Sequence, residues 1–375
     1  MKRPFMFITV MIMFAIGCAT PPPKAKLPAD FLLAGTSSEG DLKDITERKK
    51  AVYHALKERS GQSSIVIIYD ASGSMVDKGG EKGQRKFEAA YQGLYHIGSL
   101  FGSEDEVKLL VFGSTKPFGL MKDGSVFHND YHRAMEAAED VRLVYSCAPG
   151  RFNRTEFYSS IKYLESEKAY KGDTPIGYAV LKAHEQLREA KNAKVILITD
   201  GQETGPQLSH VVSKDKNREI RLRKEFQNYD DITIGAETAI KGLVSDNINF
   251  SPIVYGLGSS SSDTAESNRI REYFRDLAAK SGSLYIEAMT PLELLNAFMD
   301  AELMSVRYGL YSSVDGKKQE AFSGRVGIPI SAEEGSYTLG IHLPSPLEYP
   351  VELRPSEKNI YYFVTDGSGR ITVKK

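Results

Sequence analysis

The feature that most constrains this chain is an apolar run, Ser64-Ile-Val-Ile-Ile-Tyr69, that leads directly into Asp70-Ala-Ser-Gly-Ser-Met75. A short unbroken apolar run is typical of a strand that is buried on both faces of a parallel sheet. Asp70, Ser72 and Ser74 place one carboxylate and two hydroxyls at the end of that strand, and such oxygen ligands suit a hard divalent cation. The sequence therefore predicts a layered α/β fold with a cation site at the end of one strand.

A second strand-like run also ends on an acidic residue, where Val195-Ile-Leu-Ile-Thr199 leads into Asp200-Gly201. Between the two runs, Thr174 lies directly before Pro175 at the expected start of a helix. Asp-x-Ser-x-Ser, then a threonine, then an aspartate that closes a later strand is the order of ligands in a metal-ion-dependent adhesion site. The chain therefore resembles the von Willebrand factor A (VWA) domain family, and the resemblance extends over residues 63 to 302.

The resemblance implies a role for each of the five residues. Ser72 and Ser74 would bind the ion directly, and Asp70 and Asp200 would bind it directly or through water. Thr174 would change between these two modes as the domain changes state. The expected ion is Mg²⁺ or another hard divalent cation such as Mn²⁺ or Ca²⁺, since oxygen ligands alone do not suit Zn²⁺. In this family an Asp or Glu of a partner protein fills the remaining position, so the implied function is metal-dependent protein binding.

Each part of the pattern also has a plain structural explanation. Ser72-Gly-Ser74 suits a turn, Thr174 before Pro175 suits a helix start, and Asp200-Gly201 suits a turn after a strand. The metal site is favoured because these parts occur together, in order, and at one edge of the expected sheet. The remaining alternative is a scaffold whose metal site is vestigial and which binds partners through its loops or its C-terminal module.

Short apolar runs alternate with helical patterns over most of the chain. This alternation predicts an α/β fold with a doubly wound, mostly parallel sheet of the VWA or Rossmann-like kind. Ligands of such sheets bind beyond the carboxyl ends of the strands, where the strand order reverses, and both Asp70 and Asp200 follow the pattern of strand ends. The expected strands are 64–69, 107–112, 141–145, 195–199, 251–256 and 283–286, and the expected helices are 84–100, 175–190, 266–280 and 291–302.

Changes in composition divide the chain into consecutive parts. A stretch rich in Pro, Ala, Lys, Ser and Gly follows the N-terminal apolar segment and predicts a flexible tether. After the α/β region, short alternating runs separated by turns such as Asp315-Gly316 predict a small antiparallel β module. The expected parts are a lipoprotein signal peptide at 1–17, the tether at 18–40, a leading helix at 41–62, the VWA domain at 63–303 with insertions at 113–173 and 204–250, and the β module at 304–375.

The N-terminus carries a targeting pattern. Met1-Lys-Arg3 is basic, and the apolar segment from Phe5 to Gly17 is too short for a permanent membrane span. Ala15-Ile-Gly-Cys18 resembles the processing box of bacterial lipoproteins, which implies that Cys18 carries lipid and anchors the chain in the cell envelope. Ala19 after the cysteine favours the outer membrane, with the chain facing the periplasm. An ordinary signal peptide or an uncleaved anchor is the alternative.

Composition narrows the function further. The formal net charge is −1 at pH 7, and nothing in this balance indicates binding to nucleic acid. If Cys18 carries lipid, Cys147 has no disulfide partner and is expected to be a small buried apolar residue rather than a nucleophile. His128, His132 and Glu136 would share one face of a helix and could bind a transition metal, but their sequence context favours an exposed loop. No small-molecule substrate is evident.

An enzyme alternative rests on three short motifs. Ser159-Ser-Ile-Lys162, Ser245-Asp-Asn247 and Lys280-Ser-Gly282 occur in the order found in penicillin-binding-type serine enzymes. Lys280-Ser-Gly282 is expected to close a helix, however, whereas those enzymes need this motif on a strand. We therefore expect a non-enzyme: a membrane-tethered, divalent-cation-dependent protein-binding module of the bacterial cell envelope.

Overall fold

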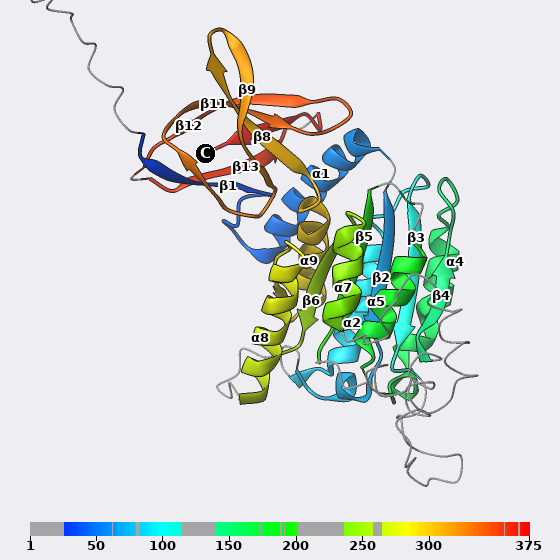
Figure 1. Cartoon of the computed structure of the whole chain (residues 1–375). Coiled ribbons are helices and arrows are strands. Elements are labelled where there is room, and N and C mark those ends of the chain that lie inside the picture. The colour runs from blue at the N-terminus through cyan, green and yellow to red at the C-terminus, as the bar shows by residue number, and fades with distance from the viewer. Residues whose placement is uncertain are drawn as a thin grey trace, which may run out of the picture.

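The structure is a computed structural model, and two layered parts make it up (Figure 1). It describes residues 26–375 except 62, 80–82, 115–139, 173, 188–189, 191, 202–235, 258–264, 356 and 367. The predicted signal peptide, the predicted lipidation residue Cys18 and the set His128, His132 and Glu136 lie outside the described residues. No helix in the described ranges is both long enough and apolar enough to cross a membrane.

The larger part is built on a six-stranded sheet in the order β4-β3-β2-β5-β6-β7. All neighbouring strands are parallel except β3 and β4, which are antiparallel. Because β3 lies on one side of β2 and β5 on the other, the strand order reverses between β2 and β5. The doubly wound, mostly parallel sheet is thus confirmed. Its strands are β2 (Ser64–Asp70), β3 (Glu106–Phe112), β4 (Arg142–Ser146), β5 (Ala193–Thr199), β6 (Asn249–Tyr255) and β7 (Ile286–Ala288).

Helices cover both faces of this sheet (Figure 1). Side chains of β2 alternate between the faces: Val66 and Ile68 belong to one apolar core, and Ile65 and Ile67 belong to the other. The first core is closed by α5 (Ile176–Glu185), α7 (Ala236–Ser245) and α8 (Ala265–Lys280). The second is closed by α2 (Lys86–Gly98), α4 (Arg154–Ile161) and α9 (Pro291–Leu303), together with the short 3-10 helices η1 (Gly73–Val76), η3 (Lys162–Glu165) and η4 (Glu167–Ala169).

Two of these helices lie in the predicted insertions 113–173 and 204–250. In α4, Phe157 and Ile161 are fully buried in the core beneath α2, and in α7, Ala239 and Ile240 are fully buried beside α5. Both helices therefore complete the layers of the α/β part. Their eight and ten residues are too few for a helical period to stand out from the long segments around them.

The smaller part is a β module of two four-stranded sheets that enclose a third apolar core. The antiparallel β module predicted for the C-terminus is confirmed, with one parallel pair, β1 and β13, added to it. One sheet has the order β12-β11-β8-β9, from β8 (Arg307–Val314), β9 (Lys317–Arg325), β11 (Gly335–Ile341) and β12 (Leu347–Leu353). The other has the order β10-β1-β13-β14, from β1 (Pro28–Ala34), β10 (Ile330–Glu333), β13 (Asn359–Thr365) and β14 (Ile371–Lys374).

Strand β1 corrects the predicted tether. Residues 18–40 were expected to be unstructured, but Pro28–Ala34 pairs with β10 on one side and with β13 on the other. Phe31 and Leu33 are fully buried in the core of the β module. The prediction is wrong here because Ala29, Phe31 and Leu33 alternate with polar positions, and the average composition of the longer segment conceals this period of two.

The leading helix α1 (Leu42–Ser60) joins the two parts. Asp41 caps its start by accepting a hydrogen bond from the backbone N–H of Asp44 at 2.9 Å. Val52 and Leu56 pack into the core of the β module, and Tyr53 packs into the core of the α/β part. The two parts are therefore held together by apolar contacts on two sides of one helix.

Candidate metal centre

The two predicted aspartates lie at the carboxyl ends of neighbouring strands. Asp70 is the last residue of β2, and Asp200 follows β5 directly. The strands pair in parallel, with Tyr69 opposite Ile198. Both side chains are buried, and the strand order reverses between them. The structure thus brings the two carboxylates to the point where ligands of such sheets bind.

The three predicted hydroxyls lie at the same edge of the sheet. The hydroxyl of Ser74 is 3.1 Å from that of Ser72 and donates a hydrogen bond of 2.8 Å to Oδ1 of Asp200. A Cβ atom at Gly201 would lie 3.8 Å from Oγ of Ser74 and 3.9 Å from Oγ1 of Thr174. Thr174 therefore approaches the pair of serines across the glycine that follows Asp200.

The loop that carries the serines is fixed by close backbone contacts. Ser72 forms an isolated parallel bridge with Gly172, two residues before Thr174. Gly113, which follows β3, has a φ of 74°, and a Cβ atom there would lie only 2.4 Å from the backbone N of Ser72. Only glycine fits this position without displacing the serine loop. The ends of β2 and β3 and the segment before α5 thus hold the hydroxyls in place.

Asp70 is oriented from two sides. Its Oδ1 accepts a hydrogen bond of 2.7 Å from the backbone N–H of Ser72, and its Oδ2 accepts one from the hydroxyl of Thr199. Burial, and next the nearby charge of Asp200, raise the pKa of Asp70 to about 7, although the hydrogen bonds from Ser72 and Thr199 oppose this shift. A cation bound between the two carboxylates would offset the repulsion between their negative charges. Thr199 was not predicted as part of the site, because a threonine within an apolar run gives no sign of which carboxylate it will contact.

Lys86 is a further member of the site that the sequence analysis missed. It is the first residue of α2, and its Nζ lies 2.7 Å from Oδ2 of Asp200. The only local signal for its role is its position in the first turn of α2, where a positive charge is unfavourable unless an anion lies nearby.

The residues at this edge fit a hard divalent cation. Asp70 and Asp200 supply carboxylate oxygens, and Ser72, Ser74 and Thr174 supply hydroxyl oxygens. Within the described ranges, no group of three or more His, Cys, Asp and Glu side chains is arranged to hold a metal. Neutral hydroxyls would therefore have to complete the ligand set. An all-oxygen set of this kind suits Mg²⁺, Mn²⁺ or Ca²⁺.

The motifs of the enzyme alternative are not assembled. Ser159, in α4, donates its hydroxyl hydrogen bond to the backbone of its own helix. Ser245 closes α7, and Lys280 at the end of α8 forms ion pairs with Asp276 and Glu237. Helix α4 covers one face of the sheet, whereas α7 and α8 cover the other. The same separation leaves Lys162, which follows α4, on the opposite side of the sheet from Asn247, which follows α7. The order of these motifs in the sequence therefore has no counterpart in space.

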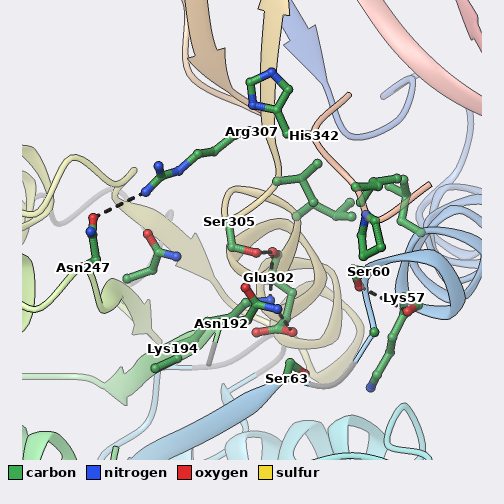
Figure 2. Close-up of a pocket in the computed structure, with 18 of the residues that line it drawn as sticks. Lys57, Ser60, Ser63, Asn192, Lys194, Asn247, Glu302, Ser305, Arg307 and His342 are labelled. Atoms are coloured by element: carbon green, nitrogen blue, oxygen red, sulfur yellow. Dashed lines mark hydrogen bonds and ion pairs between the residues drawn. The ribbon is translucent and has the colours of Figure 1, made fainter. Parts of the chain in front are cut away.

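A hollow of about 700 Å³ lies at the seam between the α/β part and the β module (Figure 2). Asn192 and Ser63, which precede β5 and β2, and Arg307 at the start of β8 line it. On its floor, Nζ of Lys194 is 3.0 Å from a carboxylate oxygen of Glu302. The hollow contains none of the predicted metal ligands. The β module therefore lies at the amino ends of the central strands, at the opposite end of the sheet from Asp70 and Asp200.

No family model matches this sequence, and no curated protein matches it. Among solved structures the chain is similar to the conserved hypothetical protein BatB from Bacteroides thetaiotaomicron, at 16% identity and a TM-score of 0.37, over 64% of this chain and 97% of the other. It is similar to a von Willebrand factor type A protein from Catenulispora acidiphila, at 12% identity and a TM-score of 0.41, over 88% of this chain and 74% of the other. It is also similar to the vWF domain of the type V pili tip protein Mfa5 from Porphyromonas gingivalis, at 12% identity and a TM-score of 0.38, over 65% and 94% of the two chains.

Proposed function

We propose that this chain is a VWA-type protein-binding module in which Asp70, Ser72, Ser74, Thr174 and Asp200 hold a hard divalent cation. The ion accepts a carboxylate from an Asp or Glu of a partner protein. The observation that carries this proposal is the position of Ser74, whose hydroxyl contacts both Ser72 and Asp200. One hydroxyl thereby links the loops after two neighbouring strands at the reversal point of the sheet.

The composition of the ligand set supports the binding of a further oxygen ligand from outside the chain. Two carboxylates and three neutral hydroxyls supply five oxygen ligands and leave one position of a six-coordinate divalent ion open. An ion held in this way attracts a further oxygen ligand from outside. On a partner surface, the carboxylates of Asp and Glu are the oxygen ligands that carry a full negative charge. The metal would then act as the bond between two proteins.

We also propose that lipid on Cys18 anchors the chain in the bacterial cell envelope, at the outer membrane and facing the periplasm. Strand β1 begins at Pro28, so ten residue steps separate the cysteine from the folded β module. Ten residues span at most about 35 Å when fully extended. The β module would thus lie near the membrane, and the metal-site edge, at the far end of the sheet, would face away from it.

The proposal is tested first by metal binding to the chain from Ala19 to Lys375, which keeps β1. Isothermal titration with MgCl₂ is expected to show one site in the wild type and none in Asp70→Ala, with both proteins equally folded by circular dichroism. Binding of Mg²⁺ to both proteins with the same affinity would contradict the assignment of the ligands.

A second step tests the partner. Both proteins are immobilised and exposed to envelope extract in Mg²⁺ and in EDTA, and retained proteins are identified. A partner held only by the wild type in Mg²⁺ supports the proposal. A partner held equally under all conditions would indicate the alternative scaffold with a vestigial metal site. The ion pair between Lys86 and Asp200 favours that alternative, since the ammonium already supplies one positive charge there.

A further inference from the structure

Lys86 and Ser74 contact different carboxylate oxygens of Asp200. Oδ1 accepts the hydrogen bond from Ser74 at 2.8 Å and thus faces the cluster of hydroxyls. Oδ2 contacts the ammonium of Lys86 at 2.7 Å. The lysine therefore contacts the carboxylate oxygen that faces away from the hydroxyls, and its ammonium does not lie among them.

The side chain of Lys86 is held in this place by the backbone of two loops. A Cβ atom at Gly79 would lie 2.6 Å from Cε of the lysine, and one at Gly256 would lie 2.8 Å from its Cγ. The side chain is only 13% exposed. Glycines on both sides thus let the two loops enclose the aliphatic stem. The ammonium is built into the site and is not a surface group that happens to be nearby.

The charge of the site follows from this arrangement. Asp70 and Asp200, when both ionised, carry two negative charges, and the hydroxyls of Ser72, Ser74 and Thr174 carry none. Lys86 reduces the sum to one negative charge. A bound divalent cation would then leave the site with a net positive charge instead of a neutral one. In a partly buried site this difference acts strongly on an approaching anion.

We propose that Lys86 sets the charge of the metal centre, so that the ion is bound less tightly but attracts the partner's carboxylate more strongly. Lys86 is a positioning residue, because it acts through Asp200 and does not touch the ion. This inference rests on the proposed metal-dependent function. It predicts opposite effects on two affinities, which a purely structural role would not produce.

The test uses the variant Lys86→Met, which keeps most of the aliphatic stem and removes the charge. The affinity for Mn²⁺ alone is measured by isothermal titration. The affinity of the Mn²⁺-loaded protein for acetate, a minimal carboxylate, is measured by water-proton relaxation. We expect the variant to bind Mn²⁺ at least about tenfold more tightly. The repulsion between one positive charge and a divalent ion on the two sides of a carboxylate weakens binding by about that factor, even with the screening of water. Acetate is expected to bind at least about threefold more weakly, because the variant loses the attraction between that positive charge and a singly charged anion.

Arg85→Gln is the matched control. It removes a positive charge from the adjacent residue, whose side chain is 40% exposed and paired with Glu167 rather than with Asp200. Both affinities should change less than about twofold, because water screens an exposed charge. Lys86→Gln repeats the test if the methionine variant does not fold, as judged by circular dichroism.

The outcomes separate the inference from the function on which it rests. Tighter Mn²⁺ binding together with weaker acetate binding supports the inference. Loss of both affinities, or no change in either, would overturn it and leave Lys86 with a structural role. Wild-type protein that binds no Mn²⁺ while Lys86→Met binds it would show that the lysine replaces the ion. If neither protein binds Mn²⁺, the proposed metal function itself fails.

Discussion

Proton competition at Asp70 gives a quantitative test of how a cation would enter the site. Burial and the charge of Asp200 raise the pKa of Asp70 to about 7 in the metal-free protein. A metal needs the ionised carboxylate, so a protonated Asp70 has to lose its proton before the ion binds. The apparent affinity for Mg²⁺ should therefore fall by up to about tenfold for each pH unit below the pKa.

The expected size of the effect follows from that pKa. With a single proton of pKa about 7, the apparent Kd for Mg²⁺ rises about 25-fold between pH 7.5 and pH 5.5. A carboxyl group that kept the ordinary aspartate pKa of 3.8 would leave the Kd almost unchanged over this range. The assay is isothermal titration of MgCl₂ in pairs of buffers with different ionisation enthalpies, which counts the protons released on binding.

Asp70→Asn is the matched control, because the amide keeps the shape of the side chain and cannot be ionised. It should bind Mg²⁺ weakly and without this pH dependence. A wild-type Kd that is constant from pH 7.5 to pH 5.5, with no proton release, would show that Asp70 does not exchange a proton for the ion.

The same shift has a consequence for stability without metal. The folded-state pKa of Asp70 is raised, so the folded protein holds this proton more tightly than the unfolded chain does. The contribution of Asp70 to the free energy of unfolding is therefore greatest below the ordinary carboxyl pKa and is lost as pH rises through about 7. Saturating Mg²⁺ should remove this loss in urea-denaturation experiments.

Two further predictions concern the framework of the site. Phe31→Ala should lower the free energy of unfolding by about 3–5 kcal/mol in urea denaturation, because the ring is fully buried. Leu27→Ala, at a side chain that is 53% exposed, should change this free energy by less than about 0.5 kcal/mol. Equal effects of the two substitutions would contradict the role of β1 in the core. Gly113→Ala should weaken Mg²⁺ binding at least about tenfold, because the new Cβ would displace Ser72. Gly150→Ala is the control: its φ of 76° is similar, but nothing lies within 4 Å of the new Cβ, so Mg²⁺ binding should not change. Similar Kd values for the two variants would show that the close approach to Ser72 does not matter.

The central strands and the placement of Asp70 and Asp200 could be predicted because they depend on local patterns. An apolar run that ends in an aspartate marks a buried strand and its carboxyl end. The rule that ligands bind where the strand order reverses then places both residues at one edge. The structure agrees, since β2 and β5 are neighbours.

The parts that could not be predicted depend on contacts between distant residues. Strand β1 is defined by pairing with β13, more than 300 residues away, and its alternation is short. Lys86 reaches Asp200 across 114 residues, and Thr199 reaches Asp70 across 129. Nothing in the local sequence of a lysine or a threonine tells which carboxylate it will contact. The placement of the candidate ligands at one edge of the sheet could therefore be predicted as a pattern, but not the side chains that orient them.

The proposed metal site can be located by a crystal structure of the chain from Ala19 to Lys375 grown with Mn²⁺, with anomalous diffraction measured to find the metal. We expect one anomalous peak at the ends of β2 and β5, roughly 2 Å from the hydroxyl oxygens of Ser72 and Ser74. We also expect Nζ of Lys86 still to contact Oδ2 of Asp200 with the ion in place. A peak elsewhere, or none at this edge at saturating Mn²⁺, would show that these residues do not hold the ion.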